Sequence, residues 1–126
     1  MAKYLTKDQI LSAEDREATE VEVPEWGGTV RIMAPSAWEL SEYQSSQIKV
    51  EFDKQGNPQR RVDMTGADVR LAAMCIVDDE GERMFSEKEL KKLGQKSSKA
   101  LDRVVRAIRE LRGMDEELGV AEGNSE

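Results

Sequence analysis

The sequence of 126 residues contains no histidine and a single cysteine, Cys75. Without histidine, the chain lacks the commonest general base and the commonest metal ligand of proteins. One cysteine cannot form an intrachain disulfide or a thiolate zinc cluster, which is typical of a protein in a reducing compartment. No apolar run approaches the roughly 20 residues of a membrane span, and the first residues lack a signal-peptide core. We therefore expect a cytoplasmic protein that does not enter a membrane.

Motifs for catalysis and cofactor binding are also missing. The densest acidic cluster is Asp78-Asp79-Glu80, but adjacent side chains in a turn point in different directions, whereas a two-metal site needs acids from separate elements. Gly27-Gly28 is followed by neither a Lys-Ser/Thr pair nor a helix, so it is not a phosphate-binding loop. No serine, lysine or cysteine has an evident activating base. We predict no catalytic residue, no metal, no cofactor and no enzymatic activity.

Aromatic residues make up 5% of the chain and charged residues 36%, with a net charge of −7, so we expect an aliphatic core. Residues 1–82 carry nine basic and seventeen acidic side chains, whereas residues 83–112 carry ten basic and four acidic ones. The basic block is either the solvated face of a helix or a surface complementary to an acidic one, within the chain or between copies. A candidate acidic surface for contacts between copies is residues 14–25.

Helix starts are marked by capping boxes, in which a serine or threonine is followed three residues later by Glu or Gln. Such pairs occur at Thr6–Gln9, Ser36–Glu39 and Ser86–Glu89. The first predicts a helix of only two turns, and the second predicts a helix over residues 37–47. The longest helix is expected to begin at Ser97 or the serine after it.

Apolar and polar residues alternate on both sides of the turn Pro24–Gly28, which predicts a β-hairpin over residues 19–33. Residues 48–63 also alternate in part. They predict either a second hairpin or a mobile loop. We favour the loop, because the second arm has only Val62 and Met64 to bury.

Apolar residues at helical spacing predict two buried helix faces. The helix opened by Thr65–Asp68 is expected to bury four residues, namely Val69, Ala72, Ala73 and Ile76. Cys75 is expected to be a small core residue rather than a reactive thiol. The last helix, which ends near Arg112, has the clearest apolar stripe: Leu101, Val104, Val105, Ile108 and Leu111. This stripe is either core or an exposed groove for a partner, and we favour core.

Together these elements predict an α+β fold that is mostly helical, with about four to five helices and one small antiparallel β-hairpin. We expect residues 1–113 to form a single globular domain. Residues 114–126 have little to bury and carry five acids and no base. They are therefore predicted to form a disordered acidic C-terminal tail.

Four residues are candidates for protein binding: Trp26, Arg103, Arg106 and Arg109. Trp26 lies in the predicted hairpin turn and either folds back or contacts a partner, because tryptophan is enriched at interfaces. Trp38, by contrast, is expected to anchor the core, with Leu40 and Tyr43 on the inner face of its helix. A helix with regularly spaced arginines can also follow phosphates. The acidic chain and the lack of a helix-turn-helix or zinc pattern argue against nucleic-acid binding.

The order of the features is characteristic. A short capped helix and an acidic segment precede EVEVPEWGGTVRIMAPSAWE, and a polar insert follows. Next comes RLAAMCIVDDEGERMFSEKELKKLGQKSSKALDRVVRAIREL, before a short acidic tail. The most specific part is the turn VDDEGERMF with the helix before it and the two capped helices after it. Over about residues 5–115, the chain resembles the tail assembly chaperones of phages and prophages with long, non-contractile tails.

This resemblance implies a chaperone that binds and solubilises the tape measure protein, a very long helical chain, while tail tube subunits polymerise around it. It implies a homo-oligomer located in the host cell cytoplasm and absent from the mature virion. In many relatives a ribosomal frameshift produces a longer minor product, whose extra domain engages the tail tube protein. Helix-in-groove binding is the expected mode. The resemblance supplies no catalytic residue.

Two alternative functions remain open at this point. One is another small phage adaptor, such as a head–tail joining or tail-completion protein, which would stay in the particle. The other is a nucleic-acid-binding regulator, whose affinity would fall steeply with salt.

Overall fold

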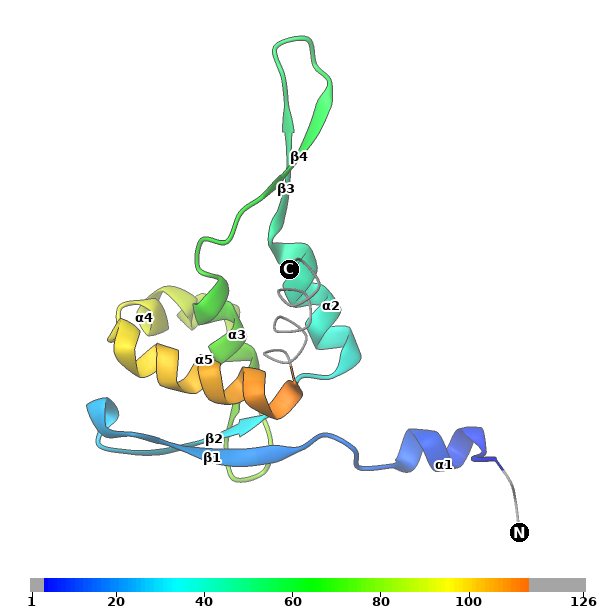
Figure 1. Cartoon of the computed structure of the whole chain (residues 1–126), viewed down its shortest axis with the longest axis vertical. Coiled ribbons are helices and arrows are strands. Elements are labelled where there is room, and N and C mark those ends of the chain that lie inside the picture. The colour runs from blue at the N-terminus through cyan, green and yellow to red at the C-terminus, as the bar shows by residue number, and fades with distance from the viewer. Residues whose placement is uncertain (1–3, 114–126) are drawn as a thin grey trace, which may run out of the picture.

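The computed structural model describes residues 4–113, and Figure 1 shows the arrangement of their elements. Five α-helices, five strands and two short 3-10 helices occur in these residues. In chain order they are α1 (Lys7–Ser12), β1 (Ala18–Val23), η1 (Pro24–Trp26), β2 (Gly28–Met33), α2 (Ala37–Ser46), β3 (Ile48–Phe52), β4 (Pro58–Val62), α3 (Ala67–Cys75), β5 (Ile76–Val77), η2 (Glu87–Glu89), α4 (Leu90–Gly94) and α5 (Ser98–Arg112).

The first predicted hairpin, β1–β2, belongs to a three-stranded antiparallel sheet with the order β1-β2-β5, so β2 is the central strand. β1 pairs with β2 so that Val21 lies opposite Val30. The turn between them contains η1 and then Gly27, the C-cap residue, which has a φ of 74°. Glycine adopts this left-handed conformation without the steric cost of a Cβ atom. β5 completes the sheet by pairing with β2, where Ile76 lies opposite Ile32.

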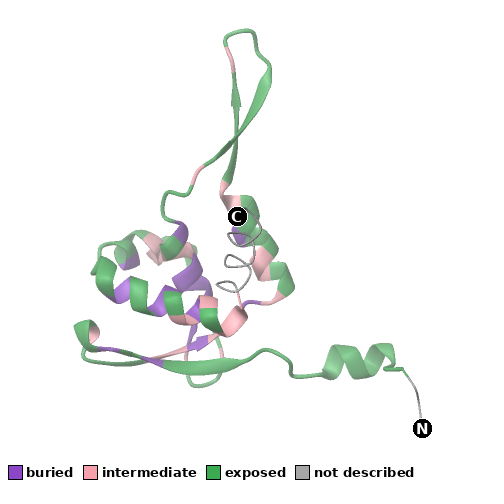
Figure 2. Ribbon diagram, in the orientation of Figure 1, coloured by how far each residue is buried: buried purple, intermediate pink, exposed green. Residues whose placement is uncertain are grey.

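The core lies around α5, which contacts β1 and β2 on one side and α3 on the other (Figure 1). Figure 2 shows that the buried positions gather on α3, α5 and the sheet. No polar or charged residue is buried among residues 4–113, so the core they form is apolar. Among residues 4–113, Tyr43 is the one aromatic residue that is buried. The core is thus mostly aliphatic, as the scarcity of aromatic residues predicts.

The helix predicted to start near Thr65 ends earlier than its apolar spacing indicates. α3 ends at Cys75, and Ile76–Val77 leave the helix to form β5. Two consecutive β-branched residues fit a strand well, and the edge of β2 offers them hydrogen-bonding partners. The buried face of α3 also includes Leu71 and Met74, which lie outside the predicted set, whereas Val69 is only partly buried.

Residues 48–63 form a second hairpin, so the preference for a loop was wrong. β3 and β4 pair antiparallel along their whole length. The Asp53 carboxylate holds the turn, because it accepts hydrogen bonds from the backbone N–H groups of Gln55 and Asn57 at 2.9 and 2.8 Å. The preference assumed that a strand needs residues to bury. Every residue of β3 and β4 is exposed, and the turn and the cross-strand hydrogen bonds specify this hairpin instead.

The three predicted capping boxes are confirmed at Thr6, Ser36 and Ser86, and Ser97 caps the longest helix. The α+β class with a mostly helical composition is confirmed as well. The predicted acidic tail, residues 114–126, lies outside the described residues. The organisation of residues 1–113 as one domain stays a prediction.

Two elements lie apart from this body in Figure 1. α1 extends from one side, and the β3–β4 hairpin projects from another. None of the α1 side chains is buried. Within residues 4–113, no helix has both the length and the apolar composition needed to cross a membrane.

The central position of α5 leads to a test of core packing. Ile108 is fully buried, so truncation to alanine leaves a cavity, and we expect Ile108→Ala to lower the free energy of unfolding by about 2–5 kcal/mol. Ile108→Val removes a single methyl group and should cost about 0.5–1.5 kcal/mol. Urea unfolding of the two variants measures both values. A loss below about 0.5 kcal/mol for the alanine variant would contradict the core assignment.

Candidate protein-binding surfaces

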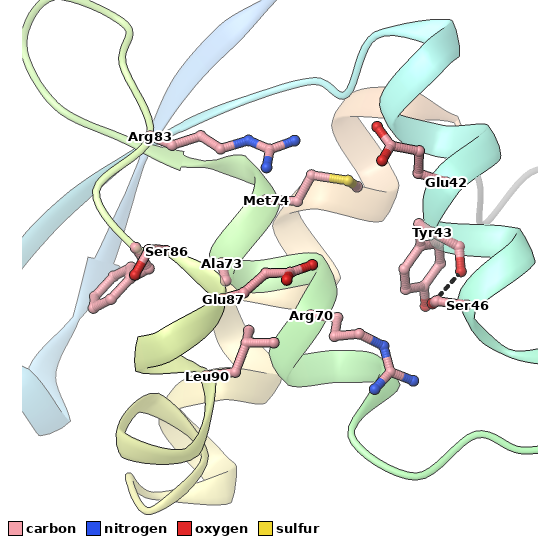
Figure 3. A pocket seen from close by; sticks show the side chains of 11 residues that line it. Glu42, Tyr43, Ser46, Arg70, Ala73, Met74, Arg83, Ser86, Glu87 and Leu90 are labelled. Atoms are coloured by element: carbon pink, nitrogen blue, oxygen red, sulfur yellow. Dashed lines mark hydrogen bonds between the residues drawn. The ribbon is translucent and has the colours of Figure 1, made fainter.

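A cleft of about 150 Å³ lies between α2 and the segment from α3 to α4. Figure 3 shows Glu42, Tyr43 and Ser46 of α2 on one side, opposite Met74 and Leu90. We call this surface the α2 cleft. It brings together residues more than 40 positions apart in the sequence, which is why no local motif indicated it.

The α2 cleft has an apolar floor and a charged rim. Tyr43 and Met74 are buried, whereas Glu42, Arg70 and Glu87 lie at the rim. The Nε atom of Arg70 is buried and has no hydrogen-bond partner in the part of the chain that the structure describes. An unpaired buried N–H group costs free energy, and this atom has almost no surface that a partner could reach. The cleft therefore combines an apolar floor, which suits an apolar side chain, with charged side chains at its rim.

Trp38 does not anchor the core as predicted, because 77% of its surface is exposed. Tyr43 is buried and Leu40 is partly buried, as expected. At 100° per residue, Trp38 lies about 200° from Leu40 and about 140° from Tyr43 around the helix axis. The helical spacing that correctly predicts Leu40 and Tyr43 on the inner face therefore also predicts Trp38 on the outer face. The exposure of Trp38 could have been predicted from the sequence.

Trp38 extends the α2 cleft along the outside of the helix. It lines a shallow hollow together with Glu42 and Ser46, and both of these residues also line the cleft. Tryptophan gives an interface a large rigid apolar area and is enriched among the residues that dominate binding energy. Trp38 and the α2 cleft together form a continuous candidate docking surface.

Glu39 positions α2 against the rest of the molecule. One of its oxygens accepts a 2.8 Å hydrogen bond from Arg16 and the other a 2.6 Å bond from Arg83. The same carboxylate accepts a bond from the backbone N–H of Ser36, which completes the capping box. Burial opposes ionisation, but the bonds from Ser36 and Arg83 and the charge of Arg16 prevail and lower the pKa of Glu39. The cap of α2 is thus tied to the segment before β1 and to the loop after β5.

Trp26 folds back and packs, partly buried, against the core. Its exposed part lines a hollow with Phe85 and Leu93, which has lysines at its rim. The first alternative for Trp26, that it folds back onto its own chain, therefore holds for the part of the indole that packs against the core. The contact of its exposed part with another protein stays a prediction.

The three candidate arginines of α5 each form an ion pair within the chain. The pairs are Arg103 with Glu25 at 2.9 Å, Arg106 with Asp102 at 2.8 Å, and Arg109 with Asp68 at 3.5 Å. Charges of the basic block and of the acidic segment 14–25 therefore meet inside one molecule at Glu25, where we had expected contacts between copies. The role of the three arginines in binding a partner stays a prediction.

The apolar stripe of α5 offers little surface to a partner. Four of its members, Leu101, Val104, Val105 and Ile108, are buried, and Leu111 is partly buried against the same core. Cys75 is fully buried in the same region, and burial raises its thiol pKa to about 12. Within residues 4–113, no group of three acidic or cysteine side chains could hold a metal ion.

A sequence model of the phage tail assembly chaperone family matches residues 6–122. The chain belongs to this family. The match includes every element of the fold from the cap of α1 onward. A search of curated proteins found no match.

One solved structure with a similar fold is described as the structure of the bacteriophage HK97 tail assembly chaperone. It shares 22% of its sequence with this family member, and the superposition has a TM-score of 0.54. The alignment covers 82% of this chain and 90% of the HK97 chain. At this level of identity, the likeness concerns the fold.

The Glu39 cluster gives a pH-dependent prediction. Glu39→Gln keeps the capping oxygen but removes the charge, and it should lower stability at pH 7 by about 1 kcal/mol, since both arginines are more than a third exposed. The pKa of Glu39 is lowered by folding, so its stabilising contribution is present above the ordinary value of 4.5 and is lost as pH falls through the folded value.

The difference between wild type and Glu39→Gln should therefore shrink on acidification, which urea unfolding at pH 7 and at pH 3 to 4 can measure. Glu80→Gln is the matched control, because Glu80 is exposed and forms no ion pair among the described residues. An equal loss in both variants would contradict this role of Glu39.

Proposed function

We propose that this family member binds the tape measure protein and keeps it soluble until tail tube subunits assemble around it. The observation that carries the proposal is the family match over residues 6–122. The chemistry expected of the tape measure protein also supports this proposal. A very long helical protein exposes apolar stripes before assembly, and such stripes aggregate unless another surface covers them.

The α2 cleft with Trp38 is the docking surface we propose for such a stripe. Apolar side chains of a partner helix would enter between Tyr43 and Leu90, and Trp38 would extend the contact along α2. The charged side chains of Glu42, Arg70 and Glu87 at the rim would supply polar contacts. Apolar anchors with one or two placed polar contacts are the usual composition of a helix-in-groove interface.

The remaining parts of the proposal follow from the family resemblance. The chain acts without catalysis in the host cell cytoplasm, self-associates and is absent from the mature virion. Recruitment of the tail tube protein takes place through a longer product of ribosomal frameshifting. Mass spectrometry of purified virions tests the expected absence directly.

Co-expression with the tape measure protein tests the proposed function. We expect this chain to raise the soluble yield of the tape measure protein without any nucleotide, because its sequence has no phosphate-binding loop. A tape measure protein that remains as insoluble as without its partner would contradict the proposal.

Trp38→Ser tests the docking surface within the same assay. The side chain is largely exposed, so the variant should fold normally, whereas removal of an interface anchor should weaken binding by roughly tenfold or more. Met64→Ser is the matched control, because Met64 is an exposed apolar residue outside the α2 cleft. Equal solubilisation by wild type and Trp38→Ser would place the tape measure protein elsewhere.

A further inference from the structure

The N-terminal arm, residues 5–15, has an apolar side without a cover. Leu5, Ile10 and Leu11 are 71%, 57% and 75% exposed, respectively. The arm contains α1, which is only six residues long. A helix of this length is marginal in water even with a capping box, and most helical stability in proteins comes from packing an apolar face. Residues 4–113 supply no apolar surface that covers the arm, so it depends on a surface from elsewhere.

The β3–β4 hairpin, residues 48–62, is also amphipathic, and its apolar face is likewise exposed. Residues directly opposite each other in an antiparallel pair point to the same face. One face carries Ile48 opposite Val62, Val50 opposite Arg60, and Phe52 opposite Pro58. The other face carries two polar pairs, one on each side of Val50 and Arg60. The apolar face is exposed, with Phe52 at 70% and Val62 at 68%, and a lone hairpin of this kind is itself marginal.

The arm and the hairpin lie on different sides of the body (Figure 1). The arm is anchored at its end, where Arg16 donates to the Ala34 carbonyl at 3.0 Å and the Ala34 N–H donates to the Glu17 carbonyl at 2.7 Å. These bonds direct residues 5–15 away from the hairpin of the same chain. Within one copy the two apolar surfaces stay apart, but two copies can bring them together.

The charges that each element leaves unpaired are opposite. The arm carries Asp8, Glu14 and Asp15 against one base, and none of these acids forms an ion pair in the part of the chain that the structure describes. In the hairpin, Glu51 is paired with Arg61 at 3.0 Å and Asp53 is engaged in the turn. A contact between two arms would bring acids together, whereas a contact between arm and hairpin pairs opposite charges.

Three cations of the hairpin, Lys49, Lys54 and Arg60, form no ion pair among the described residues. Lys49 lies on the polar face and Lys54 in the turn, whereas Arg60 lies on the apolar face itself. A contact between two hairpins would therefore place Arg60 of one copy near Arg60 of the other. In the arm, Asp8 lies one turn before Leu11, beside the apolar side of α1. Asp8 is thus the acid best placed to meet Arg60.

We propose that the N-terminal arm of one copy docks on the apolar face of the β3–β4 hairpin of a second copy, with Asp8 facing Arg60. This interface names the surfaces of the self-association included in the proposed function, and it is separate from the α2 cleft. The contact joins two different surfaces, so it closes into reciprocal pairs or rings, or it propagates as an open spiral. The contact would bury the exposed apolar faces of both α1 and the β3–β4 hairpin.

Disulfide trapping between two preparations tests the contact directly. Leu11→Cys protein is mixed with Phe52→Cys protein, and the native Cys75 does not interfere because it is fully buried. We expect the mixed disulfide to form in preference to either homodimer. Leu11→Cys with Met84→Cys is the matched control, since Met84 is an exposed apolar residue outside the hairpin. Equal trapping in the control pair, or mainly homodimers, overturns the proposal.

A charge swap gives a second test that leaves the cysteine chemistry aside. Arg60→Glu and Asp8→Arg should each weaken self-association by roughly fivefold in light scattering at low salt, and the double variant should regain most of the loss. Lys91→Glu, a reversal of the same sign on α4, should have little effect. Failure of the double variant to recover overturns the pairing of Asp8 with Arg60.

The outcomes separate this interface from the proposed function. A wild-type chain that remains monomeric at high concentration and low salt overturns the interface, while solubilisation of the tape measure protein can still be observed. Leu11→Ser and Phe52→Ser provide the other comparison. If they leave self-association unchanged and reduce only that solubilisation, the hairpin holds the assembly partner, and docking of a second copy is overturned.

Discussion

The fold depends on the burial of one face of α5 between the sheet and α3. This face is aliphatic, and no polar residue among residues 4–113 is buried with it. Apolar burial of this kind is strong but has no preferred direction. It therefore decides which elements pack together but does not fix the orientation of elements at the border of the core. α3, α4 and the sheet remain attached because they share this core. α1 and the β3–β4 hairpin bury no residue in it, and they project from the body as separate elements.

The orientation of α2 comes from a polar contact that lies at the edge of this core. Glu39 first acts within the helix, as the third residue of a capping box. The capping oxygen also accepts a bond from Arg16, and the second oxygen accepts bonds from Arg83, so Glu39 joins two residues that are distant in the sequence. Charged hydrogen bonds are directional, so they fix an angle that apolar packing leaves open. The fixed helix presents Tyr43 to the core and Trp38 to solvent, and these two side chains belong to the docking surface that we propose along α2.

Charge patterning has a different meaning in the folded chain than in the sequence. The basic block of residues 83–112 is partly neutralised inside the molecule, through Glu25, Glu39 and Asp68. Both projecting elements also carry charged side chains without an ion pair among the described residues, such as Asp8 in the arm and Arg60 in the hairpin. In our proposal the body of this tail assembly chaperone keeps a stable core, while exposed apolar surfaces with charged edges bind other proteins.

The sequence by itself determined the features that depend on neighbouring residues. Capping boxes at Thr6, Ser36 and Ser86 bond within one turn, and the stripe of α5 follows from helical spacing, so both were predictable. Tertiary structure alone decided the features that need distant residues. Ile76 continues the apolar helix pattern in the sequence, but in the fold it forms a strand because it pairs with Ile32 of β2. The α2 cleft and the Glu39 cluster combine segments far apart in the chain, and no local pattern encodes which distant segments will meet.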